Sequence, residues 1–171
     1  MRQAELIRYL VLAAQREGNR RLTRELRAIG LTPAQSEVLR ILGDYAPLSL
    51  TGLGALLVSE RGTSPSRLVD RLVVADLVAR AVATDDRRHV TLTLTAAGRS
   101  TERAVREVED RLYADLDAAT AGLDLSTMIH ALGVLSAGLL AGNAVGNRLA
   151  TPKTRATEPA PAHTVTGRDP T

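Results

Sequence analysis

Serine and arginine side chains gather in two short stretches of the 171-residue sequence, and their chemistry suits a phosphate-rich partner. The first stretch contains Ser64, Ser66, Arg67 and Arg71, and the second is the acidic and basic run 85–88. A guanidinium group donates paired hydrogen bonds to phosphates or to guanine in duplex DNA, and hydroxyls also donate to phosphates. These residue types favour a nucleic-acid contact, although a solvated helix surface and a polar turn have the same composition.

Other kinds of chemistry lack the residues that they need. The sequence has no Cys, which excludes disulfides, thiolate zinc sites, cysteine nucleophiles and cysteine-based sensing of oxidants. His89, His130 and His163 are far apart in sequence and do not have the spacing of a metal site. None of the serines in the first stretch has a histidine near it, and no glycine-rich phosphate loop occurs. We therefore expect no enzymatic activity, no cofactor and no metal.

The composition is that of a globular chain with an aliphatic core. Hydrophobic residues make up 44% of the sequence and charged residues 24%. Aromatic residues are only 2%, which argues against recognition of single strands by base stacking. The net charge of +3 is unevenly distributed, because residues 1–30 carry +4, residues 61–99 carry +3 and residues 100–147 carry −4. The basic segments suit an anionic partner or are solvated surfaces.

Two short helices with a turn between them would position the first stretch. Residues 51–58 are expected to form a helix capped by Thr51, and Ser64-Pro65 is a start signal for a helix over 65–76. The apolar side of this second helix holds Leu68, Val69, Leu72 and Ala75, and the opposite side holds Ser66, Arg67, Asp70 and Arg71. A helix-turn-helix inserts such a second helix into the major groove of DNA, which is about 12 Å wide.

A β-hairpin is predicted directly after this helix. Residues 77–83 are apolar and β-prone, and residues 89–95 alternate between aliphatic residues and threonine, as in a half-buried strand. The charged loop 84–88 joins them, so the hairpin has the form of a wing. Arginines in a wing can enter the narrow minor groove, where negative potential is concentrated. Asp86 is expected to pair with one neighbouring arginine and leave the other for DNA.

Further helices flank this region on both sides, and their expected ends coincide with capping or breaking residues. The elements are a helix over 5–29 ended by Gly30, a helix from Thr32-Pro33 to about 42, a strand at 48–50, a helix from Thr95 to about 121 ended by Gly122, and a last helix over 126–149. Residues 151–171 hold four of the seven prolines and are predicted to be a disordered tail.

Two segments resemble the multiple antibiotic resistance regulator (MarR) family. They are SPSRLVDRLVVADLVAR at 64–80 and DDRRHVTLTLTAAG at 85–98. The family has a similar RLVDRL recognition helix, a Leu-Val-x-Arg step and a D-R-R-x-V-x-L-x-L-T-x-x-G wing. The resemblance covers about residues 30–100, and the flanking helices agree in length and position.

The resemblance implies a mainly α fold with a small β-hairpin wing, a winged helix-turn-helix with N- and C-terminal dimerisation helices. It divides the chain into a dimerisation helix (1–30), a DNA-binding domain (31–100), a long helix plus a C-terminal dimerisation helix (101–150) and the tail (151–171). The implied assembly is a homodimer.

The resemblance also assigns roles to individual residues. Ser64, Ser66 and Arg67 would contact the major groove and its phosphates. Arg88 with Arg87 would lie at the minor groove, and Asp86 would brace the wing. Arg71 is expected either at a phosphate or in an ion pair with a helix acid.

Three features depart from the family pattern. Pro65 lies where a β-branched residue is usual, which affects base preference at that position. The turn Glu60-Arg61-Gly62 is unusual, and Ala75-Asp76 replaces a common Gly before Leu77.

Residues 125–147 contain no Lys, Arg, Asp or Glu and are long enough to cross a membrane. Polar residues and four glycines lower the apolarity of the stretch, so we expect no membrane contact. Gly138, Gly142 and Gly146 would form one smooth helix face, which lets another backbone approach closely. The prediction is a tight seam between subunits.

The expected function is a cytoplasmic, nucleoid-associated regulator that binds double-stranded DNA as a homodimer, most simply a repressor on a palindromic operator. The resemblance implies release by a small aromatic or phenolic effector, in a pocket expected to be lined mainly by Leu, Val and Ala. The alternative is a winged-helix module that docks another protein. Arg67, Arg87 and Arg88 favour DNA, because a protein-docking face more usually carries exposed apolar residues.

Overall fold

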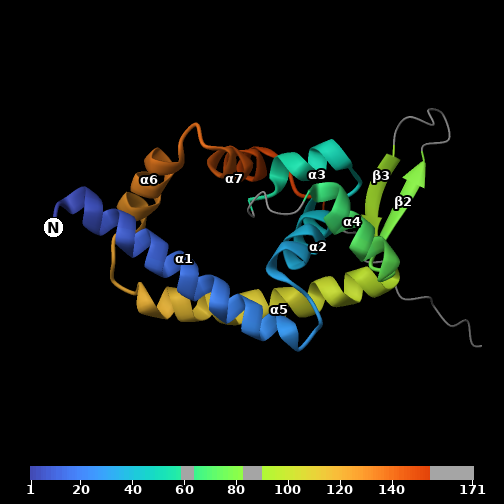
Figure 1. The fold of residues 1–171 in the computed structure, drawn as a ribbon, viewed down its shortest axis with the longest axis horizontal. Helices are drawn as coiled ribbons and strands as arrows, with labels where there is room; N and C mark the ends of the chain where they lie inside the picture. The colour runs from blue at the N-terminus through green and yellow to red at the C-terminus, as the bar shows by residue number, and fades with distance from the viewer. Residues whose placement is uncertain (59–63, 83–89, 155–171) are drawn as a thin grey trace, which may run out of the picture.

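The computed structural model describes residues 1–58, 64–82 and 90–154 (Figure 1). Within them the chain is mainly helical with one small antiparallel sheet, which confirms the predicted fold class. In chain order the elements are α1 (Gln3–Arg27), α2 (Pro33–Tyr45), β1 (Leu48–Ser49), α3 (Leu50–Leu56), α4 (Pro65–Val74), β2 (Val78–Val82), β3 (Val90–Leu94), α5 (Ala96–Ala119), α6 (Leu125–Ser136) and α7 (Leu140–Ala150).

The predicted hairpin is confirmed, and it belongs to a sheet in which β3 lies between β1 and β2. The hairpin register pairs Val78 with Leu94 and Val82 with Val90. Leu92 and Leu94 are buried as the alternation predicts, whereas Val90 is 39% exposed. Val90 lies at the far end of the hairpin, where β2 and β3 extend beyond the helices (Figure 1).

Three of the four helix caps that the sequence predicts are present, at Thr32, Ser64 and Thr95. Thr32 forms a capping box with Gln35: the Gln35 N–H donates to Thr32 Oγ1 at 3.3 Å, and the Thr32 N–H donates to Gln35 Oε1 at 3.0 Å. Thr95 Oγ1 accepts from the Gly98 N–H at 2.9 Å and opens α5. The predicted cap of α3 by Thr51 is wrong. The cap lies two residues earlier, at Ser49, whose Oγ accepts from the Gly52 N–H at 3.0 Å, and the helix begins at Leu50.

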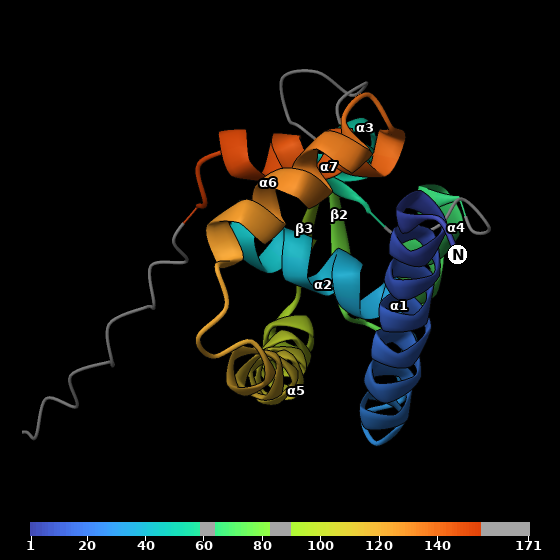
Figure 2. The ribbon, with the colours of Figure 1, turned by 90° about the vertical axis from the view of Figure 1, so that its left-hand side faces the viewer.

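Helix α2 is the central element of the fold. Figure 2 looks along α5 and shows α2 between α5 and the strands, and α2 also contacts α1, α3 and α4. The core around it is aliphatic, as the composition requires, and its fully buried members are Leu26, Leu39, Ile41, Leu42, Leu53, Leu72, Leu92, Val38, Val69, Val78 and Val105. Ala75 was predicted on the buried side of the α4 helix but is exposed, because α4 ends at Val74.

The single last helix predicted over 126–149 is wrong. Gly138 has a φ of +73°, in the left-handed region that ends a helix, and the chain divides there into α6 and α7. A Cβ on Gly142 would lie 2.1 Å from the Ser136 carbonyl oxygen, so this glycine admits the end of α6. The predicted face shared by Gly138, Gly142 and Gly146 therefore does not exist. No helix within the described ranges combines the length and the apolarity needed to cross a membrane.

Large apolar side chains remain exposed at the end of the molecule away from the sheet, where α6 and the start of α1 lie (Figure 1). On α1 they are Leu6, Ile7, Leu10 and Val11, and on α6 they are Met128, Ile129, Leu132, Val134 and Leu135. The side chain of Ile129, for example, is 65% exposed. An apolar surface of this kind is typical of an interaction surface.

Because Gly98, the glycine of the wing motif, is closely packed, we expect alanine there and alanine at Gly18 to change the free energy of unfolding in opposite directions. A Cβ at Gly98 would lie 1.9 Å from the Leu77 carbonyl oxygen, which belongs to backbone that cannot move aside. Gly98→Ala should lower the free energy of unfolding by about 1–3 kcal/mol or more in urea denaturation. Gly18→Ala is the control, because its Cβ meets nothing within 4 Å and should raise stability by about 0.5–1 kcal/mol. Equal effects from the two variants would contradict the close packing of α5 on Leu77.

Candidate nucleic-acid interface

Helix α4 begins at the residues that the sequence predicts. The Ser64 side chain accepts a hydrogen bond from the Arg67 N–H at 3.3 Å and caps the helix. Pro65 occupies the first turn, where its missing N–H costs no hydrogen bond and its fixed φ suits a helix. Helix α3 lies against α4, and a Cβ on Gly54 would be in ordinary contact with Pro65 Cγ, at 3.7 Å. The departure at Pro65 is therefore compatible with a well-formed helix.

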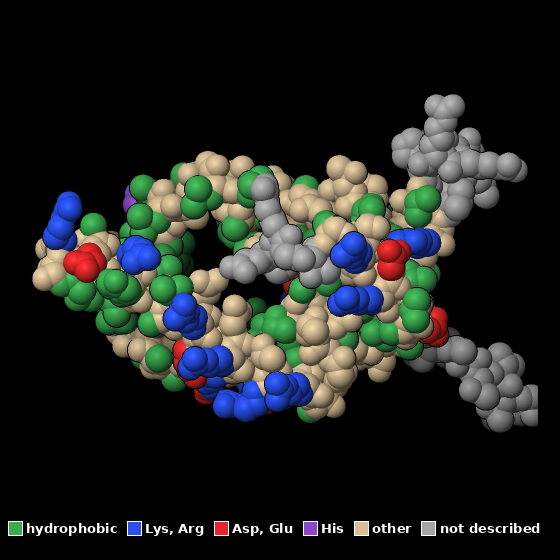
Figure 3. Space-filling model, in the orientation of Figure 1, with side chains coloured by type: hydrophobic (Ala, Val, Ile, Leu, Met, Phe, Trp, Pro, Cys, Tyr) green, Lys and Arg blue, Asp and Glu red, His purple; other side chains and the backbone are tan. Residues whose placement is uncertain are grey.

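The two sides of α4 differ as predicted. Leu68, Val69 and Leu72 are buried, at 4% exposure or less. Arg67 and Arg71 are exposed, and neither forms an ion pair with an acid in the part of the chain that the structure describes. Ser66 is half-buried. In Figure 3 basic side chains lie over this region of the surface, next to an acidic one.

The acid on the exposed side of α4 is neutralised from β2. Arg80 Nη2 donates to Asp70 Oδ1 at 2.6 Å, and both side chains are about half exposed. This pair removes the negative charge that would otherwise oppose an anionic partner. The role of Arg80 in this pair was not predicted from the sequence, although Arg80 is the arginine of the Leu-Val-x-Arg step. Only the turn between α4 and β2 brings the two residues together.

That turn also explains the departure at Ala75-Asp76. Asp76 has a φ of +56°, a left-handed conformation that glycine adopts without strain and that aspartate tolerates better than most residues. Thr95 Oγ1 donates to the Asp76 carbonyl oxygen at 2.6 Å and holds the turn against the start of α5. The chain thus keeps the backbone conformation for which the family pattern has Gly.

The wing contacts fall outside the described residues. Asp86, Arg87 and Arg88 are in the stretch 83–89, and the turn Glu60-Arg61-Gly62 is in the stretch 59–63. Their proposed roles therefore stay predictions. Of the predicted DNA-facing set, the structure brings together Ser64, Ser66, Arg67 and Arg71 on one helix.

A second feature is a cavity of about 410 Å³ next to α2. Most of its lining residues are polar or charged, and only Leu22 and Val58 are of the types expected for an effector pocket (Leu, Val and Ala). The lining residues are Asn19, Leu22, Pro33, Ser36, Glu37, Arg40, Ile41, Asp44, Tyr45, Val58, Glu109, Tyr113, Arg148 and Lys153. Two of the three tyrosines of the sequence line it. Periodicity could not reveal this cavity, because its residues come from helices far apart in sequence.

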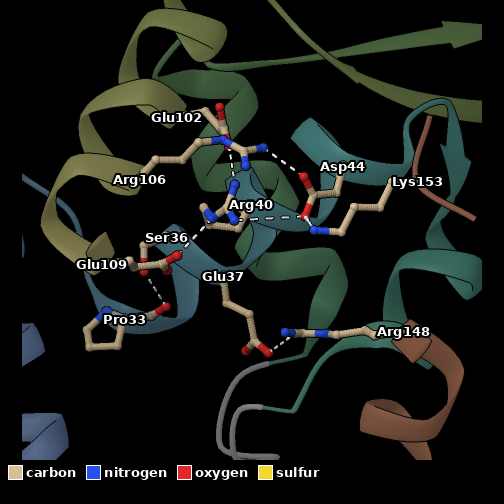
Figure 4. A network of polar contacts seen from close by, with 10 residues as sticks. All are labelled: Pro33, Ser36, Glu37, Arg40, Asp44, Glu102, Arg106, Glu109, Arg148 and Lys153. Carbon is tan, nitrogen blue, oxygen red and sulfur yellow. Dashed lines mark hydrogen bonds and ion pairs between the residues drawn. The ribbon is translucent and has the colours of Figure 1, made fainter. Parts of the chain in front are cut away.

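The floor of the cavity is an ion-pair network between α2 and α5 (Figure 4). Arg40 donates from Nη1 to Glu102 Oε1 at 2.6 Å and from Nε to Glu109 Oε2 at 2.8 Å. Burial would lower the pKa of Arg40, but these hydrogen bonds and carboxylate charges outweigh it and raise the pKa. Glu102 is only 6% exposed, and Gly43 leaves room for it, because a Cβ there would lie 2.8 Å from its carboxyl carbon.

Asp44 joins the same network from the next turn of α2. It accepts from Arg106 Nη2 at 2.7 Å, and Lys153 Nζ lies 3.0 Å from its Oδ2. Burial would raise the pKa of Asp44, but these partners and the charge of Arg40 outweigh it, so the pKa lies below its ordinary value. The described ranges contain no group of His, Cys, Asp and Glu side chains that could hold a metal ion.

Comparison with known proteins points to one family. Residues 31–90 match the model of the MarR family, a stretch that runs from the start of α2 to the first residue of β3. This part of the chain is similar to the MarR family. None of the curated proteins compared with the chain matches it.

Solved structures of bacterial regulators have a similar fold at low sequence identity. A mutant of MarR from E. coli in complex with operator DNA is 24% identical, with a TM-score of 0.65 over 74% of this chain and 91% of that one. BpsR of Bordetella bronchiseptica is 21% identical, with a TM-score of 0.66 over 81% and 98%. The organohalide-sensing regulator RdhR, bound to 2,4-dichlorophenol, is 19% identical, with a TM-score of 0.68 over 82% and 83%.

The lowered pKa of Asp44 predicts how one substitution depends on pH. Asp44→Asn should lower the free energy of unfolding by about 1.5–3 kcal/mol at pH 7, because Arg106 and Lys153 lose a charged partner. A carboxylate with a lowered pKa stabilises the fold above its unfolded pKa of about 3.9, and this contribution is lost as the pH falls through the folded value. The difference between Asp44→Asn and the wild type should therefore shrink below about pH 4. The exposed Asp117→Asn is the control, and a difference that persisted at low pH would refute the pairing.

Proposed function

We propose that this protein is a transcription regulator that binds duplex DNA as a homodimer, and that it represses by occupying a palindromic operator. The observation that carries the proposal is α4: its apolar side is packed, Arg67 and Arg71 are exposed without an ion pair to any described acid, and Asp70 is neutralised by Arg80. A helix presented in this way suits the major groove. The MarR of E. coli, which shares the fold, was crystallised with operator DNA.

Exposed apolar side chains support the homodimer. The start of α1 and α6 leave Leu6, Leu10, Ile129 and Leu135 open to solvent, which a second copy of the chain would cover. Two-fold symmetry would place two α4 helices about one helical turn of DNA apart, so the operator should be palindromic. The wing residues Arg87 and Arg88, braced by Asp86, would add contacts in the flanking minor grooves. Such a regulator works in the cytoplasm, on the nucleoid.

The cavity beside α2 supports a small-molecule effector. Its lining comes from α1, α2, α5 and α7 and from Val58 and Lys153, and it includes the side chains of Tyr45 and Tyr113. A related structure contains 2,4-dichlorophenol, and DNA binding by BpsR is regulated by 6-hydroxynicotinic acid. An aromatic or phenolic effector in this cavity would shift α2, and with it the spacing of the two recognition helices in the dimer. DNA affinity would then fall.

Substitution of Arg67 and Arg71 tests the proposed interface. Arg67→Ala should weaken binding to a duplex selected from a random pool by about 1–3 kcal/mol and relax the preference at one base position. Arg71→Ala should weaken binding to all duplexes by a similar factor. It should also reduce the slope of log affinity against log salt by about 1, as expected for a phosphate contact. The exposed Arg103→Ala on α5 is the matched control and should change neither quantity. If all three variants bind DNA like the wild type, α4 docks another protein instead.

The Asp70–Arg80 pair predicts a non-additive effect on the same affinity. Arg80→Ala exposes the Asp70 carboxylate next to the DNA phosphates and should cost about 1 kcal/mol of binding free energy. Asp70→Asn should remove most of that loss when combined with Arg80→Ala, because the unpaired charge is then absent. A double variant as weak as Arg80→Ala alone would mean that Arg80 contacts DNA itself.

A further inference from the structure

Helix α7 caps the end of α3, the first helix of the helix-turn-helix. Asn147 Nδ2 donates to the Ala55 carbonyl oxygen at 2.9 Å, and Arg148 Nε donates to the Leu56 carbonyl oxygen at 2.7 Å. These two carbonyls belong to the last two residues of α3. They are 92 residues away from their donors in sequence, so the contact is purely tertiary.

The last turn of any helix leaves backbone carbonyls without partners inside the helix. Many helices satisfy them with a left-handed glycine after the last turn. The residue after α3, Leu57, is instead extended, with a φ of −75° and a ψ of 125°. Side chains from α7 therefore supply hydrogen bonds that such a cap would otherwise provide.

Glu37 ties the same contact to α2. It accepts from the Val58 N–H at 2.8 Å, directly after α3, and it also pairs with Arg148 (Figure 4). Arg148 thus contacts the end of α3 through one carbonyl and through one shared carboxylate. The three elements α2, α3 and α7 meet at this point, at the end of α3.

Residues after α7 extend the attachment along α2. The Tyr45 hydroxyl donates to the Arg148 carbonyl oxygen at 3.1 Å, Lys153 pairs with Asp44, and the Thr154 N–H donates to the Asp44 carbonyl oxygen at 2.7 Å. We call α7 together with residues 151–154 the C-terminal strap. Its helical part is hydrogen-bonded to α3, and residues 153 and 154 are bound to α2.

We infer that the C-terminal strap sets the position of α3 and thereby of the recognition helix α4, with Asn147 and Arg148 as positioning residues for DNA binding. Helix α3 is in contact with α4, so a shift of its end would be transmitted to Arg67 and Arg71. The inference rests on the proposed function. It assigns the strap an effect on DNA affinity without any contact to DNA.

The strap also forms one wall of the cavity. Arg148, Lys153 and their partners Glu37 and Asp44 all line it. A molecule with an anionic or hydroxyl group bound there would meet the same side chains that hold α3. Cavity occupancy and helix position are thus linked by ion pairs that a ligand can compete for.

The test compares two asparagines on the same helix in the full-length protein. Asn147→Ala removes one bond to α3, whereas Asn143 is exposed one turn earlier and Asn143→Ala is the matched control. Asn147→Ala should raise the Kd for the selected duplex by about 2- to 10-fold, and Arg148→Ala by more, with the salt slope unchanged because no phosphate contact is lost. Amide hydrogen exchange at Val58 should be faster in both variants without DNA.

Arg148→Lys separates charge from geometry, because lysine can pair with Glu37, but its single nitrogen does not have the fork of a guanidinium group, which reaches Glu37 from Nη2 and Leu56 from Nε. The Kd of Arg148→Lys for the selected duplex should lie between those of the wild type and Arg148→Ala. The inference is overturned if Asn147→Ala and Arg148→Lys fold, bind the duplex as the wild type does and leave exchange at Val58 unchanged. A wild type that binds no duplex would instead overturn the proposed function, and the exchange measurement still decides whether the strap holds α3.

Discussion

The rest of the structure depends on the ion pairs of Arg40, whose side chain is only 19% exposed. A guanidinium group is seldom removed from water without partners, and here Glu102 and Glu109 of α5 supply carboxylates at hydrogen-bond distance. Removing one member of such a group leaves a charge without compensation, so the pairing favours this arrangement of α2 on α5. Asp44 and Arg106 extend the same constraint by one turn. Ion pairs of this kind specify geometry more than they add stability.

This constraint reaches the proposed DNA-binding surface through α2. One side of α2 is held to α5 by charge, and the other sides carry Val38, Leu39 and Leu42 into the aliphatic core that α4 shares. The recognition helix is therefore placed relative to α5, and α5 leads to the apolar helices at the other end of the molecule. The cavity and the strap lie along this route, so a regulatory ligand would act on a connection that already exists.

Local signals explain how much could be predicted from the sequence. Thr32, Ser64 and Thr95 mark helix starts, because a cap bonds to a residue within the next three positions. The two strands of the hairpin follow from an apolar run and an alternating run. The exposed arginines of α4 followed from the same helical periodicity. The Asp70–Arg80 pair, the charged lining of the cavity and the α7 cap on α3 join residues that only the tertiary fold brings together. The break at Gly138 was missed because three glycines at helical spacing fit an unbroken helix equally well.

The most direct test of the central claim is a selection of duplexes from a random pool, followed by titration of the winners against scrambled duplexes over a range of salt. We predict that the selected duplexes share a palindromic consensus and that affinity for them falls steeply with salt. At moderate salt they should bind at least about 10³-fold tighter than scrambled duplexes. If no duplex is enriched, and all bind only in the non-specific range of about 10⁻⁴–10⁻⁶ M, the protein is not a sequence-specific DNA-binding regulator.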